Sequence, residues 1–400
     1  MLLSQTALSP SQSEKFVTSG RLVDLGSFYD VLHYPSRSRD RKITLEFDIE
    51  YSEDSPFHGF TSPRSEPRPR MSNARLLMRF WYDEKKSLPR FDLVVASVRG
   101  KVRLEARRVK GKLLLTSIPR RWDKYVAIHH IHFIPSFHPT KEPPRKIAAA
   151  INSKSSEAFS LAYAWTMVFG AIRYVSPLRA AVPRYAVVGR ITPAHPGGGG
   201  EQLLRELKSD SRPLGKRRTL LQLVNEWASD KLGIVQGLQV RHLDPNKTVL
   251  TMVAGDPAGG KEVNVASMGE GVSQLLPILT NVLGAGYDDC ILVEQPEIHL
   301  HPKLQADLGD LFVEELRKGT VHQFIVETHS EHLLLRIRRR VAEGRIRPDQ
   351  VGIVVVEPTK SGPRIRTVDL KPDGQFDDWP QGFFEEGYKE ALALALARRR

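Results

Sequence analysis

Two short stretches decide the fold of this 400-residue chain: Cys290-Ile-Leu-Val-Glu-Gln-Pro-Glu-Ile-His-Leu-His-Pro302 and, about thirty residues later, Phe324-Ile-Val-Glu-Thr-His-Ser-Glu-His332. Each begins with a short, continuously apolar run, which is typical of a strand buried on both faces of a sheet. Each run ends in carboxylate and imidazole side chains. Because open α/β sheets bind ligands at the carboxyl ends of their strands, this placement predicts a ligand site there.

The segments around these two strands favour helices. Helical patterns cover 271–283, 301–317 and 331–343, and a further strand is expected at 351–357. Strands that alternate with helices imply a parallel sheet with helices packed on it. The last third of the chain is therefore predicted to be α/β.

A Gly/Ser-rich segment, Ala266-Ser-Met-Gly-Glu-Gly-Val-Ser-Gln274, lies just before the first of these helices. The free N–H groups and the positive dipole of a helix N-terminus suit a phosphate. Ordinary helix capping uses the same residue types. The carboxylate of Glu294, at the end of the first strand, is a suitable ligand for Mg²⁺, directly or through water.

Two other interpretations of these polar residues stay open. The side chains of His299, His301, His329 and His332, with several glutamates, are possible zinc or manganese ligands, although the sequence fixes no third ligand. Alternatively, the segments are core strands with capping residues. That interpretation explains the apolar runs, but not the carboxylates and histidine at both strand ends.

The first third of the chain has the pattern of a sheet. The segment Ile43–Ile49 alternates strictly between apolar and polar residues, the period of a half-buried strand. Further strand-like segments, separated by tight turns, lie at 75–82, 91–98, 101–107 and 112–118. We expect an antiparallel meander, interrupted at 61–70 by a Pro/Arg/Ser-rich solvated loop.

The middle of the chain is predicted to be a mixed segment that contains helices. Helices are expected at 148–169, 201–208 and 220–231, and the four glycines of His195–Gly200 indicate a hinge. These glycines are not a phosphate loop, because no Gly-Lys-Ser/Thr follows them.

The composition indicates the cellular compartment of the protein and the charge of its binding partner. The chain has 59 Lys and Arg against 46 Asp and Glu, a net charge of +13, which favours a polyanionic partner. Cys290 is the one cysteine, so an intramolecular disulfide and a multi-cysteine zinc site are excluded, and a reducing cytoplasm is expected. The most apolar run, Ala158–Ile172, is short for a bilayer span of about 20 residues, so we expect no membrane association.

The combination of Glu294-Gln-Pro-Glu-Ile-His-Leu-His-Pro302 with Glu327-Thr-His-Ser330 resembles the second half of an ABC-class ATPase domain. It is similar to the DNA-maintenance branch, which includes recombination-mediator, structural-maintenance-of-chromosomes and overcoming-lysogenization-defect ATPases. Tyr174-Val-Ser-Pro-Leu-Arg179 and Trp379-Pro-Gln-Gly-Phe-Phe384 resemble segments of bacterial AAA-type ATPases that end in a small domain of unknown function. The resemblance implies a P-loop NTPase-like parallel sheet with helices, together with an antiparallel β lobe and a helical insertion.

The resemblance also implies roles for particular residues. Ser267, Gly269 and Glu270 match the signature motif, which in the family reaches the γ-phosphate of the ATP held by the partner subunit. Met268 stands where the family usually has a glycine.

On the opposite side of the nucleotide, Glu294 matches the Walker B acid that supports Mg²⁺. Gln295 occupies the position where many relatives have a catalytic glutamate, and Glu297 is the candidate to replace it. His329 matches the histidine that senses the γ-phosphate.

One family element is missing from the sequence. A phosphate loop, Gly-x-x-x-x-Gly-Lys-Ser/Thr, lies near the N-terminus in the family, and no such string occurs here. Met1–Gln5 resembles the end of the helix that follows this loop. Our hypothesis is that the ATPase fold is N-terminally incomplete, through a misassigned start codon, a split gene or a genuine loss.

Four segments are expected. They are an N-terminal remnant with the β lobe (1–145), a helical or mixed insertion (146–262), the ATPase lobe (263–357) and a small C-terminal domain (358–400).

The resemblance implies an ATP- and Mg²⁺-dependent ATPase that works as a homodimer around nucleotide, in DNA repair or defence. Without a phosphate loop, this chain is not expected to be competent alone. The alternative is a non-hydrolysing scaffold or nucleic-acid-binding module. Basic stretches at 216–218, 336–340 and 398–400 are candidate contacts for DNA or RNA. A neighbour-encoded effector is a further possible partner.

Overall fold

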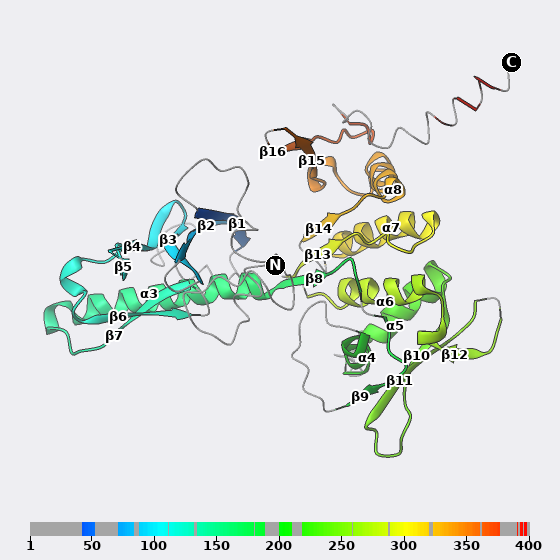
Figure 1. Ribbon diagram of the computed structural model, residues 1–400, viewed down its shortest axis with the longest axis horizontal. Coiled ribbons are helices and arrows are strands. Elements are labelled where there is room, and N and C mark those ends of the chain that lie inside the picture. The colour runs from blue at the N-terminus through cyan, green and yellow to red at the C-terminus, as the bar shows by residue number, and fades with distance from the viewer. Residues whose placement is uncertain are drawn as a thin grey trace. The chain divides into compact units, whose positions relative to one another are not determined.

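The computed structural model describes residues 42–52, 71–83, 88–110, 112–131, 134–179, 181–188, 200–209, 218–257, 259–286, 289–319, 323–360, 362–376 and five positions between 390 and 397. Two units are distinguished, residues 1–172 and 173–400, and each is described by itself (Figure 1). The predicted 61–70 loop, residues 195–199 of the predicted hinge, the 379–384 segment and the basic residues at 216–217 and 398–400 lie outside the described residues. The four-segment division stays a prediction.

The first unit contains a five-stranded antiparallel sheet in the order β1-β2-β3-β4-β5. Its strands are β1 (Lys42–Ser52), β2 (Met71–Asp83), β3 (Leu88–Val98), β4 (Lys101–Val109) and β5 (Lys112–Leu115). Arg99 and Gly100 join β3 to β4 with φ of 50° and 70°, the conformation that a tight hairpin turn requires. The predicted meander is confirmed.

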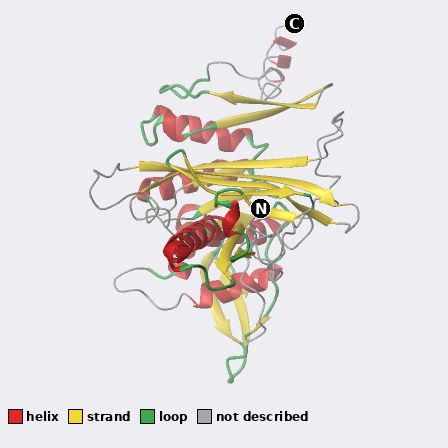
Figure 2. Cartoon of the chain, turned by 90° about the vertical axis from the view of Figure 1, so that its left-hand side faces the viewer, coloured by secondary structure: helices red, strands yellow, loops and turns green. Residues whose placement is uncertain are grey.

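A long helix covers one face of this sheet. Alternate residues of β2, namely Leu76, Met78 and Phe80, are fully buried in the core that also contains Trp165 and Phe169 of α3 (Arg145–Gly170). Figure 1 shows the full length of α3, and Figure 2 shows the same helix nearly end-on, next to the strands. The described part of this unit also contains the 3₁₀ turn η2 (Arg120–Trp122) and the hairpin of β6 (Val126–Ile131) and β7 (Ile134–Pro139).

The second unit contains the predicted parallel strands. β13 (Cys290–Glu294) pairs in parallel with β14 (Gln323–Glu327), and the described sheet has the order β14-β13-β8, with β8 at Ile172–Val175. Ile291 and Val293 of β13 are buried with residues of α6 (Glu270–Leu283) and α7 (Pro302–Lys318). Helix α8 (Glu331–Ala342) follows β14. The α/β character of this region is confirmed.

One predicted strand of the parallel sheet is in a different place. The segment expected at 351–357 forms β15 (Ile353–Thr359), which pairs antiparallel with β16 (Gly362–Val368) and not with β14. The chain reverses directly after β15, where Gly362 has a φ of 117°. The predicted parallel arrangement of this strand was wrong, because a local hairpin satisfies its hydrogen bonds.

The middle region contains both helices and strands. Helices α4 (Gly200–Ser209) and α5 (Leu220–Asn225), with a π-helical turn at Glu226–Lys231, match the expected segments. The same region contains a four-stranded antiparallel sheet of β9 (Ala186–Val187), β10 (Gln236–His242), β11 (Val249–Gly255) and β12 (Glu262–Asn264).

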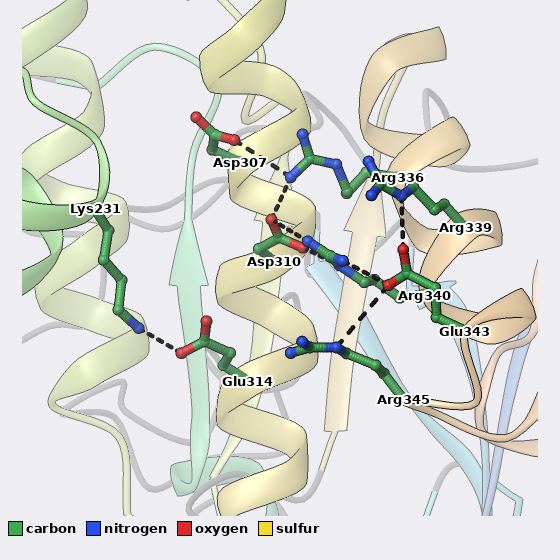
Figure 3. Close-up of polar contacts among 9 residues, drawn as sticks. All are labelled: Lys231, Asp307, Asp310, Glu314, Arg336, Arg339, Arg340, Glu343 and Arg345. Carbon is green, nitrogen blue, oxygen red and sulfur yellow. Dashed lines mark hydrogen bonds and ion pairs between the residues drawn. The ribbon is translucent and has the colours of Figure 1, made fainter.

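Ion pairs join α7 to α8 (Figure 3). On α8, the Arg336 guanidinium contacts both Asp307 and Asp310, and Arg340 binds Asp310 through two hydrogen bonds of 2.5 and 2.9 Å. Glu343 accepts hydrogen bonds from Arg339 and Arg340 at 2.7 and 2.6 Å. The basic stretch predicted as a nucleic-acid contact therefore includes arginines that hold two helices together.

Candidate nucleotide site

The two predicted strands end side by side. Glu294 and Glu327 are partners in the parallel register of β13 and β14. The Gln295 amide donates to the Glu327 carbonyl at 2.8 Å, which continues the pairing for one residue beyond β13. The polar residues that follow each strand therefore leave the sheet at the same edge, as the sequence predicts.

Glu294 has one engaged and one available carboxylate oxygen. Its Oε2 accepts a hydrogen bond of 2.9 Å from the Tyr174 hydroxyl, which comes from β8. Burial and the bond to Glu294 raise the pKa of Tyr174 above its ordinary value, so the phenol remains a donor. No hydrogen bond or ion pair within the described chain engages Glu294 Oε1. A hard carboxylate oxygen in this position fits Mg²⁺, which usually keeps several waters and needs one or two protein carboxylates.

Glu297 is bound to the turn after β14 through both of its oxygens. Its Oε1 accepts from the His329 backbone amide at 2.6 Å, and its Oε2 accepts from the Thr328 hydroxyl at 2.8 Å. Such an acceptor geometry fixes the position of His329. The role of Glu297 as a substitute for the catalytic glutamate stays a prediction.

The turn after β13 has an unusual backbone. Gln295 and His299 have φ of 43° and 61°, values that residues other than glycine rarely adopt. Strain of this kind costs about 1–3 kcal/mol per residue and persists only where the surroundings enforce it. Here the backbone N–H of Gln295 donates to the carbonyl of Glu327 in β14. The carbonyl oxygen of Gln295 accepts a hydrogen bond of 2.9 Å from Arg179.

Sequence reasoning did not assign Arg179 to the site. This residue is 7% exposed, and its Nη2 donates to the carbonyls of Glu294 and Gln295 at 3.1 and 2.9 Å. Gln274 of α6 donates to the Arg179 carbonyl at 3.2 Å. Burial lowers the pKa of Arg179 to about 10, and the charge of Glu297 opposes that shift. The one available signal was its place in the 174–179 segment that resembles the family.

The signature residues lie before and at the start of α6. Ser267 ends a 3₁₀ turn, Gly269 is the N-cap of α6, and Glu270 is its first residue. Met268 has an extended backbone with φ of −81°, so no glycine is required there, and its side chain packs against the core.

The start of α6 lies against the turn after β13. The nearest oxygen of Glu270 is 3.6 Å from Nε2 of His299. A Cβ on Gly271 would come within 3.0 Å of the His299 carbonyl, so the close approach favours glycine at this position. The structure thus brings Glu270 near the segment that contains Glu294, Gln295 and Glu297. The hydroxyl of Ser267 forms no hydrogen bond within the described residues.

The alternative of a histidine-rich metal site has no geometric support. Among the described residues, no group of three or more His, Cys, Asp and Glu side chains is arranged to hold a metal ion. His301 instead caps α7, where its Nδ1 accepts from the Lys303 amide at 3.3 Å.

A near match to the phosphate loop lies in the wrong structural context. Gly255-Asp-Pro-Ala-Gly-Gly-Lys-Glu262 has the spacing of the loop, with Glu262 in place of Ser or Thr. It connects β11 to β12 of an antiparallel pair. A phosphate loop joins a strand to a helix, so this segment is a hairpin connection.

Comparison with known families assigns the chain to a class. A family profile described as "AAA domain, putative AbiEii toxin, Type IV TA system" matches residues 79–336, more than half of the chain. The chain therefore belongs to this family of AAA-type ATPase domains. The predicted resemblance is confirmed at this level, while the DNA-maintenance branch and the C-terminal domain stay predictions.

Solved structures with a similar chain include heads of SMC proteins. The SMC head domain from Thermotoga maritima is 12% identical, with 76% of this chain and 78% of that chain covered and a TM-score of 0.31. An Smc head with an extended coiled coil, bound to the C-terminal domain of ScpA derived from Pyrococcus furiosus, is 10% identical, with 84% and 82% covered and a TM-score of 0.30. A third chain, from work on ATP-driven dimerization and DNA-stimulated activation of SMC ATPases, is 16% identical, with 45% and 92% covered and a TM-score of 0.26.

These TM-scores are low, so the family assignment rests on the profile alone. No curated protein matches the chain significantly. None of the described helices combines the length and the apolar character needed to cross a bilayer.

Proposed function

We propose that this chain is an ATPase-type module whose nucleotide site is formed at the carboxyl ends of β13 and β14. The observation that carries the proposal is the convergence of Glu294, Glu297 and the His329 turn at one edge of the parallel sheet. Family membership supports the nucleotide class. No phosphate loop occurs in these 400 residues, so tight binding and turnover require that element from elsewhere.

Within this proposal, Glu294 holds Mg²⁺ through Oε1, directly or through a water. The metal ion supplies neutralisation of phosphate charge, which is a main requirement of phosphoryl transfer. Glu297 orders the His329 backbone, and the exposed imidazole of His329 is available to the terminal phosphate. Arg179 and Glu327 hold the Gln295 backbone, and Gln295, an amide, orients a water rather than deprotonating it.

The proposed assembly is a homodimer with nucleotide between the two copies. Ser267, Gly269 and Glu270 of each copy would face the nucleotide of the other. The 3.6 Å approach of Glu270 to His299 supports communication between the two sites of one copy, because His299 belongs to the turn that contains Glu297. DNA repair or defence, a cytoplasmic location and a neighbour-encoded effector remain part of this proposal as family-level expectations.

The competing function is a scaffold that keeps the fold without using nucleotide. The absent phosphate loop favours it, and the specific arrangement of Glu294 and Glu297 opposes it. The strained backbone of Gln295, which Arg179 and β14 hold in place, also opposes a scaffold, because such strain is concentrated at functional sites.

Binding of a fluorescent ATP analogue separates the two functions. We expect Mg²⁺-dependent binding by the 400-residue chain at nucleotide concentrations up to about 1 mM, which corresponds to association of about −4 kcal/mol. Glu294→Gln is expected to weaken it about tenfold, or 1.4 kcal/mol. Glu262→Gln on β12, away from the site, serves as the matched control. Binding that is absent, independent of Mg²⁺ or equal in the Glu294→Gln variant would favour the scaffold.

A further inference from the structure

The net charge of the protein is concentrated in one part of the first unit. Residues 99–146 contain thirteen Lys and Arg and three acidic residues, so this segment has a net charge of +10 out of +13 for the whole chain. The remaining residues are nearly neutral. A local excess of positive charge of this size indicates a surface that binds a polyanion, independently of the nucleotide site.

Six cations of this segment form what we call the basic surface. They are Arg120, Arg121, Lys124, Lys141, Arg145 and Lys146, and all six are exposed. Within the described residues, none of them forms an ion pair. Lys124 lies over the ring of the neighbouring Tyr125 at 5.0 Å, which leaves its charge uncompensated.

The fold brings the six cations together at one end of the β6–β7 hairpin. Arg120 and Arg121 belong to η2, and Lys124 follows one turn later. Tyr125 accepts a hydrogen bond of 2.9 Å from the Thr140 amide, and Val126 pairs with Pro139, so the chain around Lys124 lies beside the chain around Lys141. Lys141 is four residues from Arg145, a span of at most about 14 Å.

The start of α3 adds positive potential to the same place. The first turn of α3 contains no acidic residue and instead begins with Arg145 and Lys146. Basic residues at this end of a helix oppose its dipole and are unfavourable unless an anion is present. The local acids, Asp123 and Glu142, make no ion pair with these cations in the described structure.

We propose that the basic surface binds the phosphate backbone of duplex nucleic acid. A bilayer is a poorer match, because membrane-binding surfaces combine cations with exposed apolar side chains. Among residues 112–126 and 137–158, no large hydrophobic side chain is exposed, and the exposed Phe159 and Tyr163 lie about four to five turns along α3 from Arg145. Single strands are a poorer match too, because they require aromatic platforms, and Trp122 is 6% exposed. The contacts are to phosphates and carry no sequence preference.

Fluorescence anisotropy of the full chain with a labelled DNA duplex tests this surface. Association should weaken steeply as NaCl rises, with log K against log salt falling by about 0.9 for each neutralised phosphate. The variant Arg120→Ala/Arg121→Ala/Lys124→Ala should make this slope shallower by about 3 and weaken binding more than tenfold at low salt. A duplex RNA probe of the same length is expected to bind similarly, because the contacts are to phosphates.

The matched control removes the same charge elsewhere. Lys261→Ala/Lys360→Ala/Arg364→Ala removes three exposed cations of the second unit. It should leave the salt slope unchanged. Undetectable or salt-insensitive DNA binding by the parent chain, or an equal loss in both triple variants, overturns the proposal. Binding to phosphatidylserine–phosphatidylcholine vesicles without binding to the duplex would assign the surface to a membrane instead.

Discussion

The arginines of α8 and the cations of the basic surface have the same chemistry and opposite surroundings. The side chains of Arg336 and Arg340 are 19% and 17% exposed and bind aspartates of α7 (Figure 3). The six cations of the basic surface are exposed and have no acidic partner among the described residues. In sequence, 336–340 is the more conspicuous basic run.

The difference shows that a basic run cannot be assigned without its neighbours in space. Asp307 and Asp310 lie about thirty residues from the arginines that they bind, and one helical turn apart on α7. The parallel crossover from β13 through α7 to β14 and α8 places the acids opposite the arginines. No comparable acidic helix covers residues 120–146 in the described part of the first unit.

Removing the shared acid of the α7–α8 pairs should have the largest effect. Asp310→Ala leaves Arg336 and Arg340 partly buried without this partner. Because both are about one-fifth exposed, we expect a loss of about 2 kcal/mol in the free energy of unfolding, below the range for fully buried pairs. Urea denaturation measures it.

Asp349→Ala is the control for this measurement. Asp349 pairs with Arg347, and both side chains are about 70% exposed. An exposed pair contributes at most about 1 kcal/mol, and often nothing measurable. Equal destabilisation by Asp310→Ala and Asp349→Ala would mean that the partly buried ion pairs between α7 and α8 contribute no more stability than an exposed pair.

A smaller effect is expected when the charge is kept and the geometry is lost. Arg340→Lys keeps the cation but cannot reproduce the two parallel hydrogen bonds to Asp310, at 2.5 and 2.9 Å. We expect a loss of about 1 kcal/mol in denaturant unfolding. Arg339→Lys, at a side chain that is 65% exposed, should be nearly neutral. If Arg340→Lys leaves the free energy of unfolding unchanged, the positive charge alone is sufficient to hold α8 against α7.

Acid should weaken the α8 network at its exposed end. Hydrogen bonds from Arg340 and Arg339 hold the pKa of Glu343 below its ordinary value of 4.5. The folded state therefore binds this proton less readily than the unfolded state. The stabilisation is present above pH 4.5 and is lost as the pH falls through the lower folded value. Glu343→Gln should differ from the parent in thermal stability at pH 7 and converge with it in acid. A constant difference would contradict this linkage.

Strands and helices with strong periodicity could be predicted from the sequence. The edge of the sheet where the site residues lie, at the carboxyl ends of β13 and β14, could be predicted as well. The alternation in Ile43–Ile49 gave a correct strand, because half-buried strands expose every second residue. The apolar runs before Glu294 and Glu327 gave the parallel pair. The position of β15 and the sheet of β9–β12 depend on pairing between segments, which local patterns do not encode.

Within the site, the limits of sequence reasoning follow from backbone contacts. The role of Arg179 rests on bonds to two carbonyls, and backbone acceptors are present at every residue. Glu297 was chosen as a candidate base from its position two residues after Gln295. Its engagement by Thr328 and the His329 amide depends on how the turns after β13 and β14 meet.

The smallest expected effect on stability is at the basic surface. Arg120→Ala/Arg121→Ala/Lys124→Ala removes three exposed charges that have no acidic partner, so the free energy of unfolding should change by less than about 0.5 kcal/mol. Relief of repulsion among the remaining cations would make the change slightly stabilising at low salt, and this part should vanish as salt is added. Urea unfolding at two salt concentrations measures both the total change in the free energy of unfolding and the part of it that depends on salt. A loss of 2 kcal/mol would mean that these cations, like those of α8, hold the fold together, and a charge cluster without partners would then no longer indicate a surface reserved for binding.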